Sequence, residues 1–148
     1  MILNKQRKVR LVARPLQEFL RRTQRELKIA NSEITIAFVS DAEMARWNEN
    51  YRKKKGPTDV LSFPATAGAS QKFAARANLA KRAVILGDIA IAPETAKRYA
   101  KKNGRTLSSE IRVLMLHGVL HLMGYDHESD HGQMNRIERK LRRRLGIA

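Results

Sequence analysis

The chain has 148 residues, the size of one domain with a single hydrophobic core. It contains no cysteine, so disulfide bonds and thiolate zinc sites are excluded. The 30 lysines and arginines exceed the 14 acidic residues and give a formal net charge of +16, which favours a polyanionic partner over a merely basic surface.

The N-terminal segment shows no targeting signal. Its first residues, MILNKQRKVRLVARPL, carry too many charges to form the apolar core of a signal peptide. No apolar run in the chain approaches the length needed to cross a bilayer. We therefore expect a cytoplasmic protein with no membrane partner.

The basic residues are clustered within 21–28, 52–55 and 139–144, and such clusters favour contact with a nucleic-acid backbone. Aromatic residues make up 5% of the chain and do not interleave with these clusters as a stacking surface for bases requires. Contact with the backbone, rather than with bases, is therefore expected.

The first third of the chain predicts a helix, a strand and a second helix. Apolar residues at helical spacing indicate a helix over about 15–28, with arginines on its other face. The segment 33–39, EITIAFV, is rich in β-branched residues and predicts a strand that is covered on both faces. Ser40 followed by Glu43 is a capping-box pattern, so a helix that buries Met44 should begin there.

The middle of the chain predicts two strands, a loop and a helix. Short apolar runs at 59–63 and 84–92 indicate the strands, and a Gly-Pro pair precedes the first of them. The alanine-rich, basic segment 65–83 has neither strand nor helix periodicity, so we expect a mobile surface loop rather than a second domain. Pro93 then opens a helix that ends at Gly104.

The last third predicts two helices. Ser108 or Ser109 caps the first, which is apolar nearly all round and should therefore lie in the core. Gly124 ends this helix, because glycine readily adopts the left-handed conformation of a helix C-terminus. The final segment 132–146 places Met134 and other apolar residues in one stripe opposite a strongly basic face.

A candidate metal site lies in the stretch HGVLHLMGYDH. His117 and His121 are four residues apart on the predicted helix, so both imidazoles project from one face and can bind one metal ion. Gly124 turns the chain and lets His127 return as a third ligand, which matches the ligand pattern of metzincin zinc proteases. All four histidines of the chain gather in this region, which favours a metal site over ordinary core histidines.

The three histidines indicate a hydrolytic metal site, and the residue after the first histidine indicates phosphodiesters as the substrate. Three neutral histidines leave one tetrahedral position of a zinc ion for water, whose pKa the ion would lower toward about 7. A zinc protease has a glutamate, its general base, directly after the first histidine, whereas this chain has Gly118. We expect Gly118 to leave space beside the metal for a phosphodiester.

Further residues are candidates for supporting roles. Arg52 could stabilise the charge of a phosphoryl transition state, although spacing alone does not separate it from the lysines at 53–55. Asp126 and Asp88 could each orient a ligand histidine. Alternatively, Asp126 could cap a turn and Asp88 could pair with a lysine. His131 is either a substitute ligand or an exposed residue near the start of the last helix.

Three segments together resemble the YbeY family of bacterial endoribonucleases: HGVLHLMGYDH, NENYRKKKGPTDVLSFP at 48–64 and LGDIAI at 86–91. The resemblance implies a single-strand-specific endoribonuclease, with one Zn²⁺ per chain, that acts in 3′-end maturation of 16S ribosomal RNA and in ribosome quality control. Carried over position by position, the metal ligands are His117, His121 and His127, and the catalytic residues are Arg52 and His117.

The resemblance also implies a fold and partners. It implies a single α+β domain over 1–148, with a small mixed four-stranded sheet, about five helices and the metal at the end of a basic groove. The expected partners are single-stranded ribosomal RNA and the small ribosomal subunit with its proteins, without a small-molecule cofactor. The segment 65–83 departs from the family, because it is basic here and often acidic in relatives.

Two other functions are compatible with the sequence. One is a ribosome assembly factor that binds RNA and uses its metal mainly for structure. The other is a metzincin-like protease, which Gly118 disfavours. The sequence also leaves the nucleophile open between a metal-activated water and the ribose 2′-hydroxyl.

Overall fold

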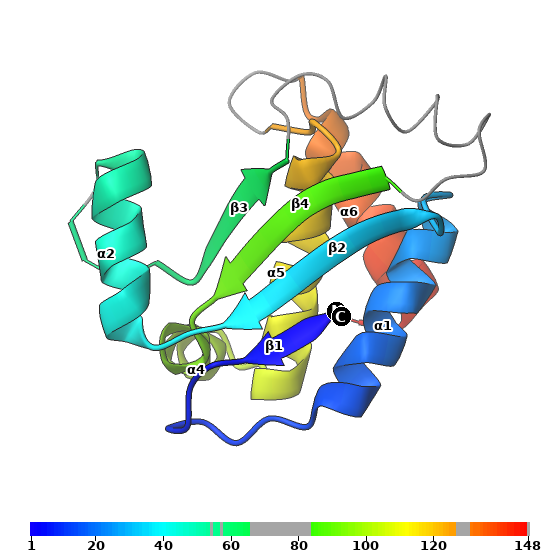
Figure 1. Ribbon diagram of the computed structural model, residues 1–148. Coiled ribbons are helices and arrows are strands. Elements are labelled where there is room, and N and C mark those ends of the chain that lie inside the picture. The colour runs from blue at the N-terminus through cyan, green and yellow to red at the C-terminus, as the bar shows by residue number, and fades with distance from the viewer. Residues whose placement is uncertain (54, 57, 66–83, 127–130, 148) are drawn as a thin grey trace.

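The computed structural model of the protein describes residues 1–53, 55–56, 58–65, 84–126 and 131–147 (Figure 1). Within these residues the strands are β1 (Ile2–Asn4), β2 (Ser32–Phe38), β3 (Val60–Pro64) and β4 (Val84–Ile91). The helices are α1 (Ala13–Glu26), α2 (Asp41–Arg52), α4 (Pro93–Lys102), α5 (Leu107–Leu122) and α6 (Gln133–Leu145). These elements confirm an α+β fold with a four-stranded sheet and five helices in the described part of the chain.

The four strands form one mixed sheet in the order β1-β2-β4-β3. Strands β1, β2 and β4 run parallel, and β3 runs antiparallel to β4. Helices α1 and α5 pack on one face of the sheet, and α6 contacts both of these helices (Figure 1). Strand β1 was not predicted, because it has three residues without a clear period and gains its hydrogen bonds only by pairing with the distant β2.

The helix starts test the predicted caps. Ser40 Oγ accepts the backbone N–H of Glu43 at 3.2 Å, which confirms the predicted start of α2. Helix α1 begins two residues earlier than predicted, and Pro15 lies in its first turn. Proline is tolerated there because N–H groups of the first turn have no hydrogen-bond partner within the helix. The predicted serine cap of α5 is wrong: Thr106 Oγ1 accepts the N–H of Ser109 at 3.1 Å, so this helix also begins earlier.

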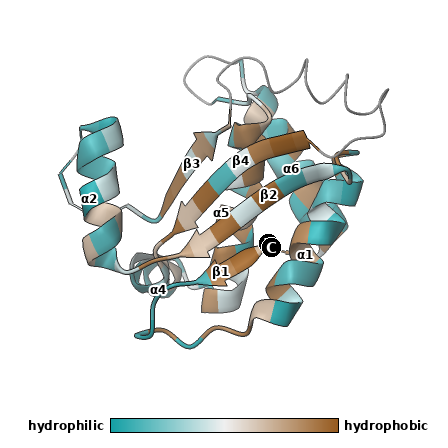
Figure 2. Cartoon of the chain, in the orientation of Figure 1, coloured by the Kyte–Doolittle hydropathy of each residue, from teal (hydrophilic) through white to brown (hydrophobic). Residues whose placement is uncertain are grey.

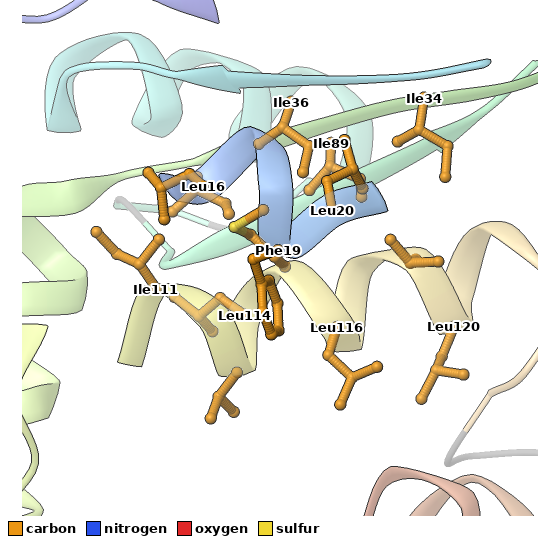
Figure 3. Packing of buried hydrophobic residues seen from close by; sticks show 14 of the residues in the cluster. Leu16, Phe19, Leu20, Ile34, Ile36, Ile89, Ile111, Leu114, Leu116 and Leu120 are labelled. Atoms are coloured by element: carbon orange, nitrogen blue, oxygen red, sulfur yellow. The ribbon is translucent and has the colours of Figure 1, made fainter. Parts of the chain in front are cut away.

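The main core forms around α5, which the sequence placed in the core because it is apolar on nearly all sides. Its apolar side chains belong to one cluster with residues of α1, β2 and β4, many of which Figure 3 labels. Mostly hydrophobic residues occupy the four strands, whereas hydrophilic residues extend along much of α1 and α6 (Figure 2). Leu116 and Leu120 are fully buried, and Met134 of α6 belongs to the same core.

Helix α5 approaches strand β4 closely at Gly118. A Cβ atom added there would lie 2.8 and 2.9 Å from the Cγ2 and Cδ1 atoms of Ile89, which is fully buried. The Oγ of Ser62 on β3 also donates to the carbonyl oxygen of Gly118 at 3.3 Å. Only glycine therefore fits between this turn of α5 and the sheet as they stand.

A second, smaller core joins α2 to the other face of the sheet. Its buried members are Val39, Met44, Leu61, Ala90 and Ala92, with Trp47 and Phe63 packed against them. Helix α2 thus buries Met44 as predicted. No helix within the described ranges is long and apolar enough to cross a membrane. The loop expected at 65–83 lies, except for Ala65, outside the described residues.

Gly118→Ala should lower the free energy of unfolding, since the added methyl group must displace the buried Ile89 side chain. Overpacking of this kind costs about 1–3 kcal/mol and should outweigh the gain of about 1 kcal/mol in helix propensity over glycine. Urea denaturation followed by circular dichroism measures the difference.

Ile89→Ala provides the control for this contact, because it removes the atoms that the new methyl group would meet. In the Ile89→Ala background, Gly118→Ala should cost less or even stabilise the fold. An equal cost in both backgrounds would show that contact with Ile89 is not the cause.

Candidate functional site

One open cleft of about 840 Å³ gathers most of the residues that the sequence singled out. It lies between the C-terminal end of α2, strand β3 and the C-terminal end of α5. Arg52, His117, His121 and Asp126 all line it. The other polar and aromatic lining residues are Tyr51, Thr58, Asp59, Ser62, Phe63 and Tyr125.

The two histidines of α5 point toward one another at this cleft. Their Nε2 atoms are 3.0 Å apart, and both side chains are half-buried. Because residues four apart share a helix face, this is the arrangement expected from the sequence. Two nitrogen atoms at this separation need a proton or a cation between them, since two lone pairs would repel each other.

This pair fits two positions of a metal site. Two ligands bound at about 2.0–2.1 Å to a tetrahedral zinc ion stand roughly 3.3 Å apart. The observed 3.0 Å differs from this by an amount that a small rotation of the rings removes. No third ligating side chain completes the site among the described residues, and the third predicted ligand, His127, lies outside them.

A glutamate that the sequence did not single out stands behind the first histidine. The Nδ1 atom of His117 lies 3.6 Å from Oε1 of Glu138 on α6, and the Glu138 side chain is only 14% exposed. Nε2 of His117 faces His121, so the carboxylate is next to the other ring nitrogen. A carboxylate in this place favours the tautomer with the proton on Nδ1, which leaves Nε2 available as a ligand.

The sequence alone does not reveal the role of Glu138, because its partner is on another helix. One signal was present: α6 holds one acidic residue among six basic ones, and that residue directly follows Ile137 of the apolar stripe. An acidic residue at the edge of an apolar face is partly buried, and a partly buried carboxylate requires a partner.

The position of Arg52 distinguishes it from its basic neighbours as a candidate site residue. It is the last residue of α2 and lines the cleft, whereas the exposed Lys53 and Lys55 do not. Lys53 has a left-handed backbone, with φ of 54°, and so directs the chain away from the helix axis. Lys54 lies outside the described residues.

Asn48 fixes the turn that follows Arg52. Its Nδ2 atom donates to the carbonyl oxygen of Gly56 at 2.9 Å, and its side chain is almost fully buried. The backbone of Gly56 has φ of 83°, a conformation that glycine adopts without strain. Asn48, the first asparagine of the NENYR segment, therefore has a structural role in positioning the cleft wall.

The charge of the cleft differs from that of the whole chain. Its described lining holds one arginine and two aspartates, Asp59 and Asp126, besides the histidines. The Oγ1 atom of Thr58 donates to Oδ1 of Asp59 at 3.4 Å. Most of the positive charge therefore lies outside the cleft, and α6 in particular carries six basic residues.

The two aspartate candidates have different positions. Asp126 is half-buried and lines the cleft, as an orienting residue requires. Asp88 is exposed and lies opposite Phe63 in the sheet, whereas the neighbouring pair Ser62 and Ile89 faces α5. Because successive residues of a strand point to opposite faces, Asp88 lies on the face away from the histidines and does not orient them.

Three other expectations concern residues near the histidines. His131 is exposed just before α6, as the sequence suggested, and Met134 is fully buried in the core. The expected space beside Gly118 is absent, because Ile89 of β4 fills it. The glycine serves helix packing and does not make room for a phosphodiester.

No aromatic residues interleave with the basic clusters along the sequence, yet the fold brings three of them to the cleft. Tyr51 directly precedes Arg52 and lines the cleft with Phe63 and Tyr125. The rings of Tyr51 and Phe63 are 5.2 Å apart at an angle of 73°. The folded chain thus joins aromatic residues that are separated in the sequence.

Comparison with known proteins gives concordant results. The family model described as Endoribonuclease YbeY matches residues 1–146. An Endoribonuclease YbeY of Solibacter usitatus is 39% identical over 132 residues, which are 89% of this chain and 78% of the relative. One from Koribacter versatilis is 35% identical over 147 residues, covering 99% of this chain and 86% of the relative.

A solved structure supports the fold. The solution structure of a protein from Thermotoga maritima matches with a TM-score of 0.65 and 25% identity. The match covers 98% of this chain and 89% of that protein. The agreement therefore extends over nearly all elements of the α+β fold.

Proposed function

The chain belongs to the YbeY family of endoribonucleases, and from this we propose that it is a zinc-dependent enzyme that cleaves single-stranded ribosomal RNA. The observation that carries the proposal is that Arg52, His117 and His121 line one cleft. We further propose that it acts in the cytoplasm, on the small ribosomal subunit, in 3′-end maturation of 16S RNA and in quality control.

The Nε2 atoms of His117 and His121 would hold the zinc ion, with His127 as the third ligand proposed from the sequence. When bound, the ion would polarise a phosphoryl oxygen and acidify a water molecule. The Glu138 carboxylate, 3.6 Å from Nδ1, would favour the His117 orientation and tautomer that this role requires.

Arg52 acts on the phosphate. Its guanidinium can donate two parallel hydrogen bonds to phosphoryl oxygens, and these bonds strengthen as negative charge develops in the transition state. Its position at the end of α2, beside a turn fixed by Asn48, limits the movement of its backbone. Water and the ribose 2′-hydroxyl remain the two candidate nucleophiles, and a cyclic phosphate among the products would identify the hydroxyl.

Charge outside the cleft supports an RNA substrate. Helices α1 and α6 contact each other, and Arg144 Nε donates to Oε2 of Glu26 at 2.7 Å. Together they carry nine arginines and one lysine against three acidic residues. Arginine suits phosphate recognition because its planar group forms paired hydrogen bonds, so we propose that these helices contact the RNA backbone.

The purified protein should contain about one zinc ion per chain, and His121→Ala should lose it. Loss of a residue that hydrogen-bonds to a metal ligand typically weakens metal binding by roughly 10–100-fold, and loss of a ligand itself should weaken zinc binding by more than this. Elemental analysis and calorimetric titration with zinc measure this. His131→Ala is the matched control, because His131 is exposed and does not line the cleft.

A wild-type protein without zinc and without chelator-sensitive RNA cleavage would contradict the proposal. If folded His121→Ala still supported RNA processing in cells, the result would favour the alternative of an assembly factor with a mainly structural metal. Proteolysis that a chelator stops would favour the protease.

Glu138→Ala should weaken zinc binding by about 10–100-fold, since the His117 ring would lose the carboxylate that orients it. Glu138→Gln should have a smaller effect, because its amide oxygen keeps a partial negative charge near Nδ1. Competition with a chromophoric chelator gives the zinc affinity without reference to activity. Glu26→Ala is the control. Glu26 is a carboxylate of α1 that also pairs with α6, but its partner, Arg144, is near the C-terminal end of that helix, away from Glu138. Equal losses in the Glu138 and Glu26 variants would indicate a general effect on α6.

Arg52→Met should lower kcat for RNA cleavage by about 100-fold or more, the usual cost of removing a donor that stabilises transition-state charge. Arg52→Lys should restore only part of this, because lysine lacks the paired donors. Lys55→Met removes a nearby charge that does not line the cleft, and kcat should stay unchanged. A rise in KM with constant kcat in Arg52→Met would show that Arg52 only binds substrate.

A further inference from the structure

Tyr51 combines high exposure with a fixed position. Tyr51 is 69% exposed and lies on the last turn of α2. The ring meets Phe63 of β3 nearly perpendicularly, with centroids 5.2 Å apart, and Phe63 meets Trp47 in the same manner at 6.0 Å. Trp47 and Phe63 pack on the second core, so this aromatic row extends from the core to the surface.

Exposure alone would carry no functional meaning, because single apolar residues are common on protein surfaces. The location of Tyr51 is what distinguishes it. It lines the cleft that also contains Arg52 and the histidine pair, and Arg52 is the next residue of the chain. Tyr99 on α4 is exposed to 42% but does not line this cleft.

We propose that Tyr51, supported by Phe63, is a stacking site for one nucleobase of the RNA substrate. The inference rests on the proposed function, in which Arg52 contacts a phosphate at the same cleft. A ring that packs against Phe63 and is largely exposed offers a planar surface at little entropic cost. A base next to the cleaved phosphate would lie on this surface while Arg52 binds the phosphate.

Such a site gives a physical reason for single-strand preference. In a duplex each base is already stacked and paired, so it must be extracted before it can reach Tyr51, and that extraction costs free energy. In a single strand the base is available. Every base has a π-face, so the site should accept all four bases and select for strandedness more than for sequence.

Binding without cleavage provides the test. The probe is a short single-stranded RNA that contains 2-aminopurine, whose fluorescence falls on stacking, added to the full chain with a chelator present. Tyr51→Ala should weaken binding by about 5–150-fold, the range that corresponds to the loss of one stacked base, and should abolish the quenching. Tyr51→Phe should bind as the wild type does, and Tyr99→Ala should have no effect.

Tyr51→Leu separates stacking from a merely structural role. Leucine still covers Phe63 but has no planar surface, so stacking predicts a loss as large as that of Tyr51→Ala. Binding of Tyr51→Leu at the wild-type level would overturn the inference and leave Tyr51 as a cover for Phe63. This comparison remains informative if the alanine variant folds poorly.

An abasic probe completes the test. An RNA that lacks the stacked base should bind the wild type and Tyr51→Leu equally, and a persistent difference would overturn the inference. These measurements use no zinc, so their failure is distinct from failure of the proposed function. Normal zinc binding and cleavage with no effect of Tyr51 on RNA affinity would reject only the stacking site.

Discussion

The close packing of α5 against β4 is the constraint on which the site depends. Helix α5 is apolar on nearly all sides, so it requires neighbours around it, and it contacts β3, β4, α1, α4 and α6. Contact between Gly118 and Ile89 fixes the rotation of the helix as well as its distance from the sheet. Successive helical residues are about 100° apart, so His117 and His121 both lie to one side of the position that faces the sheet. Burial of one glycine thereby presents two imidazoles to the cleft.

The same constraint separates this site from that of a zinc protease. The residue after the first histidine, which is the general base in such a protease, here faces the sheet. A glutamate at position 118 would be pressed against Ile89 in an apolar core, where an ionised carboxylate is strongly disfavoured. A proton acceptor for phosphodiester cleavage must therefore come from elsewhere. Among the described lining residues the carboxylates that remain are Asp59 and Asp126, which enter from two different walls of the cleft.

Local patterns in the sequence predicted the features that depend on neighbouring residues. The helix start at Ser40, the helical spacing of His117 and His121, and the limits of the three predicted strands were accurate because hydrogen bonds and side-chain periods act over a few residues. The features that were missed or misread depend on contacts between distant segments. Glu138 meets His117 from another helix, Tyr51 meets Phe63 from a strand, and the role of Gly118 is set by Ile89. Similarity to a known family selected Arg52, which spacing alone could not do.

The cleft lies at the boundary between two hydrophobic cores, and this division separates its chemical parts. The main core positions the histidines through α5, whereas the second core positions Tyr51 and Arg52 through α2. Helix α2 is linked to α4 by a polar network in which Asp41 accepts hydrogen bonds from Thr95 and Arg98. A change that loosens α2 would therefore displace Arg52 without moving the histidine pair. The proposed metal contacts and the proposed phosphate contact are thus supported by separate packing, and a substrate that spans the cleft would couple them.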